Sequence, residues 1–106
     1  MKAVVDHRTY TIKFGHMAQY VAMYQEYGYP CQVQYLGQPI GWYTSTDIGM
    51  LNQVVHLWGY DSLQERAEKR ARMKEDPRWK VFLEKILPLI ITQENKILSQ
   101  PGFIQN

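Results

Sequence analysis

Cysteine, charge of one sign and long apolar segments are all scarce in this sequence of 106 residues. The single cysteine, Cys31, excludes an intrachain disulfide and any metal site built from several thiolates. Twelve basic against ten acidic residues leave a net charge of +2, which is too small to indicate nucleic acid or an anionic membrane. Residues 27–46 carry no charge, but their glutamines, prolines and glycines exclude a membrane span. We therefore expect a cytoplasmic protein without membrane or nucleic-acid partners.

The length of the chain fits one domain, because 106 residues are too few for two independent hydrophobic cores. We expect a single domain over residues 1–106, with a folded core at about 4–98 and a loose C-terminal tail at 99–106. Eight tyrosines, three tryptophans and three phenylalanines are available to fill that core. The chain can therefore bury a sizeable aromatic interior.

Strand patterns occur in four places along the core. β-Branched and aromatic residues predict strands over residues 4–13, 52–60 and 90–98. Residues 33–43 predict a strand in two pieces, because the Gly and Pro residues in LGQP break a regular ladder. The segment TSTDIGML then connects this broken strand to the strand at 52–60.

Helix patterns occupy the gaps between these strands. Helical spacing of apolar residues predicts a helix over 16–27, which Gly28 and Pro30 end. Ser62 with Glu65 has the spacing of a capping box, and Asp76 before Pro77 is a second helix start. The first of these two helices has an apolar stripe at every fourth residue, namely Leu63, Ala67 and Ala71. The second carries Trp79, Phe82, Leu83 and Ile86 on one side, and Pro88 ends it.

The order β, α, β, β, α, α, β predicts an α+β fold of the ferredoxin-like type, in which helices cover one face of an antiparallel sheet. In the strand at 52–60 both sets of alternate residues are apolar or aromatic, so both faces of the sheet need cover. The helices can cover only one face. We therefore expect the open face, bearing Val54, Trp58 and Tyr60, to pair with a second copy in a two-fold homodimer.

Several segments form a recognisable pattern. They are Asp6-x-Arg8-x-Tyr10-Thr11, the segment from Thr46 to Tyr60, Leu63-x-x-Arg66 with Arg70, and Asp76-Pro77-x-Trp79. The most specific stretch is NQVVHLWGYDSLQER at residues 52–66, followed by DPRW. Together they resemble the NIPSNAP family over nearly the whole chain. The resemblance implies a fold similar to the dimeric α-β barrel proteins, and it implies no particular reaction. Asp47 departs from the expected pattern, in which a Glu precedes Ile48, and its carboxylate reaches one methylene less far.

Two trios of polar and aromatic side chains alternate along strands that should be neighbours. Asp47, from the connection before the strand at 52–60, adds a carboxylate. The candidate pocket therefore consists of Asp6, Arg8, Tyr10, Asp47, His56, Trp58 and Tyr60. If both trios face the barrel, they line a cavity in which His56 serves as a general base and Arg8 holds an anion or enolate. The alternative is a buried structural network in which Asp6 pairs with Arg8 or Arg70 and His56 bonds to a phenol.

Other chemistry finds little support in the sequence. The three histidines His7, His16 and His56 are far apart and lack a cysteine cluster, so we expect no metal and no cofactor, haem included. Cys31 has no obvious activating base. The basic residues between positions 66 and 85 alternate with acidic ones, which is typical of a solvated helix face.

Two functions fit these patterns. The first is a small dimeric α-β barrel whose inter-sheet cavity binds a small organic molecule. Its enzyme version transforms that molecule without a metal, through oxygenation or proton transfer, by analogy of fold alone. The second is a non-catalytic interaction or scaffold protein. A cavity that contains Arg8, His56 and ordered non-protein density would favour the first function, and a filled barrel with an exposed apolar patch would favour the second.

Overall fold

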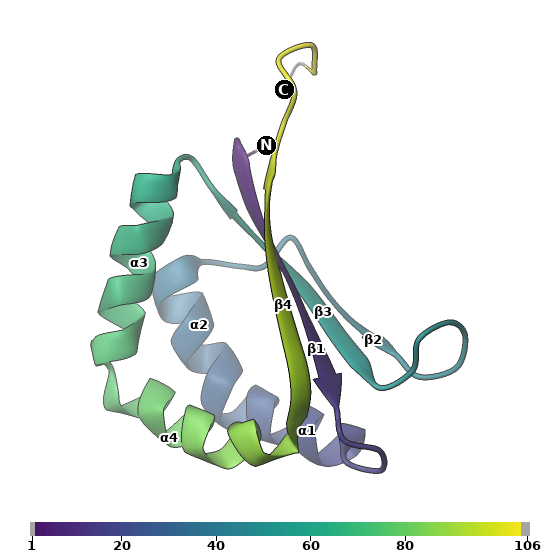
Figure 1. Cartoon of the computed structure of the whole chain (residues 1–106). Helices are drawn as coiled ribbons and strands as arrows, with labels where there is room; N and C mark the ends of the chain where they lie inside the picture. Colours follow the sequence, from purple (N-terminus) through teal and green to yellow (C-terminus); the bar gives the residue numbers. More distant parts are fainter. Residues whose placement is uncertain (1, 105–106) are drawn as a thin grey trace.

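The computed structural model describes residues 2–104 and contains a four-stranded antiparallel sheet with helices on one side only (Figure 1). The elements, in chain order, are β1 Val4–Ile12, α1 Met17–Met23, the π-helical η1 Tyr24–Gly28, α2 Tyr29–Leu36, β2 Gly41–Ser45, β3 Gln53–Tyr60, α3 Leu63–Glu75, α4 Pro77–Ile86, the 3₁₀ turn η2 Leu87–Leu89 and β4 Ile90–Ser99. The strands lie in the order β2-β3-β1-β4. This arrangement confirms the α+β, ferredoxin-like prediction.

The central strands β1 and β3 are neighbours, as the ferredoxin-like order requires. Their register places Arg8 opposite His56 and Asp6 opposite Trp58. On the other side of β1, β4 pairs along its length and continues to Ser99, which lies opposite Val4. The strand therefore extends one residue into the segment expected to be a loose tail, and residues 105–106 lie outside the described residues.

The segment at residues 29–36 is helical, so the prediction of a strand containing Val33 and Tyr35 is wrong. Gly28 and Pro30 do not end the preceding helix, because a π-helical turn follows α1 and Pro30 lies in the first turn of α2. Because the helical backbone is continuous here, Pro30 lacks one amide hydrogen that the preceding turn could use, and the wider π-helical turn directly precedes it. The helix ends instead at Gly37, whose φ of 80° is one that glycine adopts without strain.

Two capped helices, α3 and α4, follow β3 and meet at Asp76, as the sequence predicts (Figure 1). Ser62 Oγ accepts from Glu65 N at 3.0 Å, and Asp76 Oδ1 accepts from Arg78 N at 2.9 Å. The reciprocal half of the capping box differs, because the Glu65 carboxylate accepts from Asp61 N rather than from the amide of Ser62. The two caps fix where the helical layer turns over the sheet.

The prediction that Val54, Trp58 and Tyr60 face a second copy is wrong. These side chains are buried under the helices of their own chain, together with His56. The open face carries the other set of alternate residues on β3, including Val55 and Leu57, which are only half-buried. Sequence alternation alone identifies two faces, but it does not say which one the helices choose.

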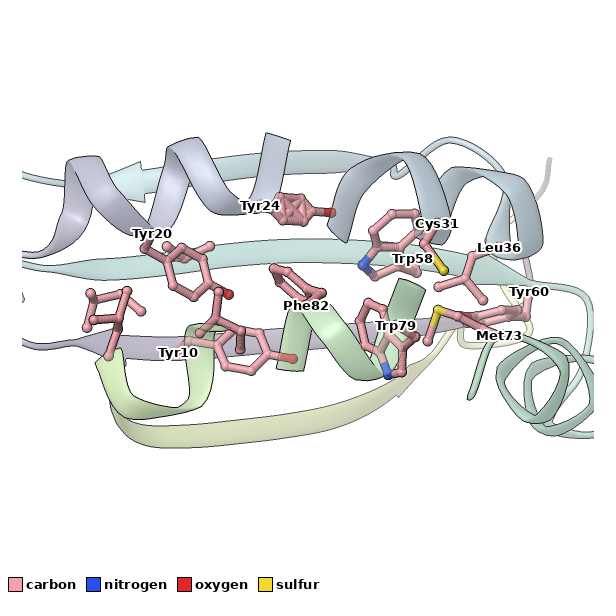
Figure 2. Packing of buried hydrophobic residues seen from close by; sticks show 14 residues of the cluster. Tyr10, Tyr20, Tyr24, Cys31, Leu36, Trp58, Tyr60, Met73, Trp79 and Phe82 are labelled. Carbon is pink, nitrogen blue, oxygen red and sulfur yellow. The ribbon is translucent and has the colours of Figure 1, made fainter. Parts of the chain in front are cut away.

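The core lies between the helices and the covered face of the sheet. Figure 2 shows Tyr10 and Tyr20 near one end of this layer and Leu36, Met73 and Tyr60 near the other. The predicted inward residues Trp79, Phe82 and Ile86 of α4 are buried, which confirms that amphipathic pattern. Within the described part of the chain, no helix has the length and apolar character needed to cross a membrane.

Candidate functional site

Three polar side chains on β1 form the centre of the site. Because Asp6, Arg8 and Tyr10 alternate along the strand, all three point to the covered face. Arg8 Nη1 donates to Asp6 Oδ2 at 3.1 Å, and Arg8 Nε donates to the Tyr10 hydroxyl at 2.8 Å. Arg66 Nε from α3 donates to the same Asp6 oxygen at 2.9 Å. Asp6 is 0% and Arg8 only 5% exposed, so a charged cluster is enclosed by a single chain.

His56 lies next to this cluster in a restricted environment. Its Nδ1 accepts from the indole nitrogen of Trp58 at 2.5 Å, and its ring stacks on Tyr10 with 5.3 Å between the ring centroids. Burial, followed by the charge of Arg8, lowers the pKa of His56 from 6.5 to about 3. The imidazole is therefore neutral at neutral pH, with its proton on Nε2 because an indole N–H can only donate. This environment argues against the predicted role of His56 as a general base.

A cavity of about 260 Å³ lies beside the cluster, between the sheet and the helices. Arg8, Tyr10 and His56 form part of its wall. Lys74 and Gln93 also line the cavity and are exposed, so the space opens to solvent between α3 and β4. The pocket was predicted between two sheets, but the cavity lies within one chain, between the helices and the covered face of its sheet.

Aromatic rings form most of the remaining wall. Tyr20 and Tyr24 reach it from the first helical segment, and Trp79 and Phe82 reach it from α4. Tyr24 begins the π-helical turn, and such turns occur frequently at functional sites. Burial raises the pKa of both Tyr20 and Tyr24, which keeps these phenols protonated. The hydroxyl of Tyr24 donates to Gln32 Oε1, which fixes the orientation of that amide.

The inward stripe of α3 is basic, which the sequence interpretation missed. Leu63, predicted to be part of the buried stripe, is 57% exposed, and Ala67 and Ala71 are exposed as well. The helix instead directs Arg66, Arg70 and Lys74 toward the sheet, at the same four-residue spacing, and the last two line the cavity. The four-residue spacing was the signal available in the sequence. It fits the stripe that begins at Leu63 and the stripe that begins at Arg66 equally well.

The seven predicted pocket residues separate into three groups. Arg8, Tyr10 and His56 line the cavity, whereas Asp6, Trp58 and Tyr60 are buried behind it and contact the lining residues or their neighbours. Asp47 is exposed in the loop between β2 and β3 and does not line the cavity. The structure thus brings six of the seven to one face and leaves the seventh elsewhere. The role of this group as a binding site stays a prediction.

Within residues 2–104, no set of three or more His, Cys, Asp or Glu side chains is arranged to hold a metal ion. Cys31 is buried as a free thiol, and burial is the main cause that raises its pKa. The polar chemistry of this region therefore rests on arginine, lysine, tyrosine and histidine.

Fold and site define a ferredoxin-like α+β domain with a charged, aromatic cavity under its helices. A NIPSNAP family model matches residues 5–104, so the chain belongs to the NIPSNAP family. A crystal structure of a protein from Agrobacterium tumefaciens is 41% identical, with a TM-score of 0.88 over 94% of this chain and 95% of that one. The two chains therefore share their fold over nearly their whole length.

More distant relatives mark the limits of the comparison. NipSnap homolog 1 of Danio rerio is 42% identical over 53 residues, which is 50% of this chain and 19% of that protein. The matched segment thus spans about a fifth of the length of that curated relative. A Nitrosomonas europaea protein named for antibiotic biosynthesis monooxygenase has a TM-score of 0.67 at 10% identity, over 92% of this chain and 97% of that one. That likeness shows the shared fold alone.

Proposed function

We propose that the chain binds a small organic molecule in the cavity between its helices and the covered face of its sheet. The observation that carries this proposal is a solvent-connected space of about 260 Å³ whose wall includes the buried side chains of Arg8 and His56. Aromatic walls with a few converging polar groups are the usual composition of a small-molecule pocket. An engineered apolar cavity of about 150 Å³ already binds benzene, so the available volume is sufficient.

The competing interpretation is a buried network that only stabilises the fold. Against it, Asp6 Oδ1 and the Tyr60 hydroxyl are buried without a hydrogen-bond partner among the described residues. Each such group lowers stability by about 1–3 kcal/mol, so a network selected for stability alone would satisfy them. A buried ion pair is itself weak evidence for a stabilising role. These features argue against a network that is kept for stability alone.

The lining residues favour stabilisation of negative charge over removal of a proton. His56 is neutral and its Nδ1 is occupied by Trp58, while the phenols of Tyr20 and Tyr24 stay protonated. Hydrogen-bond donors held in a partly water-excluded space stabilise charge that a bound molecule carries or develops. We therefore propose binding as the primary function, and any reaction there would use Arg8 and His56 as electrostatic groups.

A pair of variants on α4 tests whether ligands enter this cavity. Leu83 is half-buried and lines the cavity, whereas Val81 on the same helix is exposed and does not line it. We expect small aromatic fragments that raise the melting temperature of the native chain to lose this effect in Leu83→Trp and to keep it in Val81→Trp. Fragments that act equally on both variants, or on neither the variants nor the native chain, would contradict the proposal.

A second copy is the proposed cover for the open face of the sheet. Val5, Ile40, Leu57 and Leu98 line a shallow groove of about 350 Å³ on that face, which the helices leave bare (Figure 1). Covering a large apolar side chain contributes about 1.5–3 kcal/mol, and one self-complementary patch is enough for a two-fold dimer. The resemblance to dimeric α-β barrels supports the same sheet-to-sheet pairing, now through the face opposite to the one first predicted.

Sedimentation of two charge-introducing variants tests this pairing. We expect about twice the chain mass for the native protein and a monomer for Leu57→Glu, because a carboxylate on the open face is costly to bury. The matched variant Ile48→Glu changes an exposed residue of the loop between β2 and β3 and should remain dimeric. A native monomer at micromolar concentration, or a dimer that survives Leu57→Glu, would refute the assignment.

The loop between β2 and β3 supports the second candidate function, an interaction or scaffold protein. It exposes Ile48 at 87% and Met50 at 69%, which is an unusual concentration of apolar surface on one loop. Serine at both positions should abolish recruitment of a protein partner if this is the function. Under the first function the same double change should leave fragment binding in the cavity intact. A cytoplasmic location stays a prediction under either function.

A further inference from the structure

The chemistry of the cavity wall narrows the class of ligand, an inference that rests on the proposed function. The wall includes three cationic side chains, Arg8, Arg70 and Lys74. None of the described residues that line the cavity is an Asp or a Glu. The carboxylate of Asp6, which does not line the cavity, pairs with both Arg8 and Arg66, so its single negative charge is shared between two cations. The empty space therefore has an excess of positive charge.

The neutral polar groups on the wall are oriented as donors. The Tyr10 hydroxyl accepts from Arg8 Nε, which leaves its own proton to point elsewhere. Gln32 Oε1 is engaged by Tyr24, which leaves the NH₂ group of that amide as the available end. His56 Nδ1 is occupied by Trp58, which leaves Nε2–H. Each of these three hydrogen bonds occupies an acceptor atom of a lining residue and leaves a donor free. The free donors are suited to a ligand group that is rich in hydrogen-bond acceptors.

Arg70 is the cation best placed to select a ligand. It is half-buried on the inward stripe of α3, and no acidic side chain within residues 2–104 forms an ion pair with it. Arginines that are largely buried are normally paired, since an isolated charge is poorly tolerated away from water. A planar guanidinium without a protein partner is suited to a planar anion, which it can bind through two parallel hydrogen bonds.

The rest of the wall specifies the body of the ligand. Phe82 and Trp79 present aromatic surface, with 5.2 Å between their ring centroids, and Ile86 adds aliphatic surface. We infer that the cavity takes an organic anion with a flat apolar body, held at its oxygen atoms by Arg70, Lys74 and His56 and at its ring by the aromatic residues of α4. Figure 2 shows Phe82 and Trp79 in the layer from which this body would be contacted.

Three probes separate the parts of this inference. Benzoate has the anion and the ring, benzamide keeps the shape without the charge, and inorganic phosphate has charge without a ring. Binding is followed by the NMR signal of the Trp79 indole N–H and by calorimetry on the full chain. We expect benzoate to bind at least tenfold more tightly than either of the other probes, a difference of about 1.4 kcal/mol or more.

Two variants assign the selectivity to the cavity. Arg70→Gln should reduce benzoate affinity at least tenfold and leave benzamide affinity unchanged. Lys74→Gln, an exposed position that tolerates substitution, should reduce benzoate affinity in the same direction. Arg72→Gln removes the same charge from an exposed position of α3 that does not line the cavity, and it should change neither affinity.

The outcomes distinguish this inference from the proposed function. Equal binding of benzoate and benzamide at Trp79 that Arg70→Gln leaves intact would overturn the anion assignment and keep a small-molecule site. Phosphate binding as tight as benzoate would overturn the requirement for an apolar body. If none of the probes perturbs Trp79 at millimolar concentration, both the inference and the proposed function fail.

Discussion

The two faces of strand β1 carry opposite kinds of side chain. On the covered face stand Asp6 and Arg8, both charged and both buried. On the open face stand Val5 and Thr9, uncharged β-branched residues that are only half-buried. Strands with one solvated face usually place their polar residues outward and their apolar residues inward. On β1 the open face follows this rule at His7, Thr9 and Thr11, whereas the covered face departs from it at Asp6 and Arg8.

The difference in side chains between the two faces needs a separate explanation for each face. Burying charge under the helices has no stability argument behind it, because hydrophobic residues of similar volume serve a core at least as well. The aliphatic residues Val5, Val55 and Leu57 on the open face are likewise not explained by solubility. The contrast supports the two proposals made above, a ligand site on the covered face and a contact with a second copy on the open face.

The largest expected effect comes from removing the carboxylate of the covered face. Asp6→Ala leaves Arg8 buried without its partner, and breaking a buried pair in this way lowers the free energy of unfolding by about 3–5 kcal/mol. Thr9→Ala, on the open face of the same strand, should lower it by less than about 1 kcal/mol. Urea unfolding of both variants measures the difference. Equal losses would remove the distinction between the faces.

A pH series tests the burial of His56. The folded chain keeps this imidazole neutral down to about 3, whereas the unfolded chain protonates it below about 6.5. The unfolded state therefore binds more protons between these values, and stability should fall as the pH falls, by up to about 1.4 kcal/mol per pH unit from this group. His56→Gln should flatten the dependence, while His7→Gln, on the open face, should preserve it. The opposite pattern would mean that His56 is not enclosed.

Alanine substitutions at two glycines compare how tightly the residues pack on the two sides of the sheet. A Cβ added to Gly28 would lie 2.8 Å from the ring of buried Phe82, so Gly28→Ala should lower stability by about 1–3 kcal/mol through overpacking. A Cβ added to Gly59 on the open face would lie 2.7 Å from Lys2 Cγ, which belongs to a flexible side chain. Gly59→Ala should therefore have a smaller effect. Thermal unfolding that ranks them in the reverse order would contradict this packing.

The smallest effect is expected at the helix caps, which lie outside both faces. Ser62→Ala removes the hydrogen bond to Glu65 N and should lower stability by about 0.5–2 kcal/mol. Ser62→Asp keeps an acceptor at the cap and should restore most of the loss. Denaturant unfolding, with the native mass in sedimentation unchanged, checks that only the helix start is affected. A loss that Asp does not rescue would point to a role beyond capping.

Much of the fold is predictable because its signals are local. Ser62 and Asp76 mark helix starts through hydrogen bonds to amides two or three residues away. The strand from Gln53 to Tyr60 follows from alternation, and its position beside β1 follows from the ferredoxin-like order. Even the grouping of Arg8, Tyr10 and His56 on one face required only the two-residue period of a strand. These features depend only on residues that are close in sequence and on the ferredoxin-like strand order.

The features that could not be predicted depend on what lies opposite each residue. Gly28 is interpreted as a helix stop from its type, yet it is present because Phe82 packs closely against it, a contact 54 positions away in sequence. The stripes at Leu63 and at Arg66 have the same spacing, so only the partners of α3 decide which one faces inward. The inward position of Arg70 was not predicted, because the basic residues around it alternate with acidic ones as on a solvated helix face.

One measurement tests most directly whether the buried charges are kept for a ligand. It is the free energy of unfolding of the double variant Asp6→Val with Arg8→Met, which replaces the ion pair by apolar side chains. The account predicts a value equal to or above that of the native chain, because apolar replacement of a buried pair is often neutral or stabilising by about 1–4 kcal/mol. A loss as large as that of Asp6→Ala alone would show that the pair holds the fold together and would contradict the account.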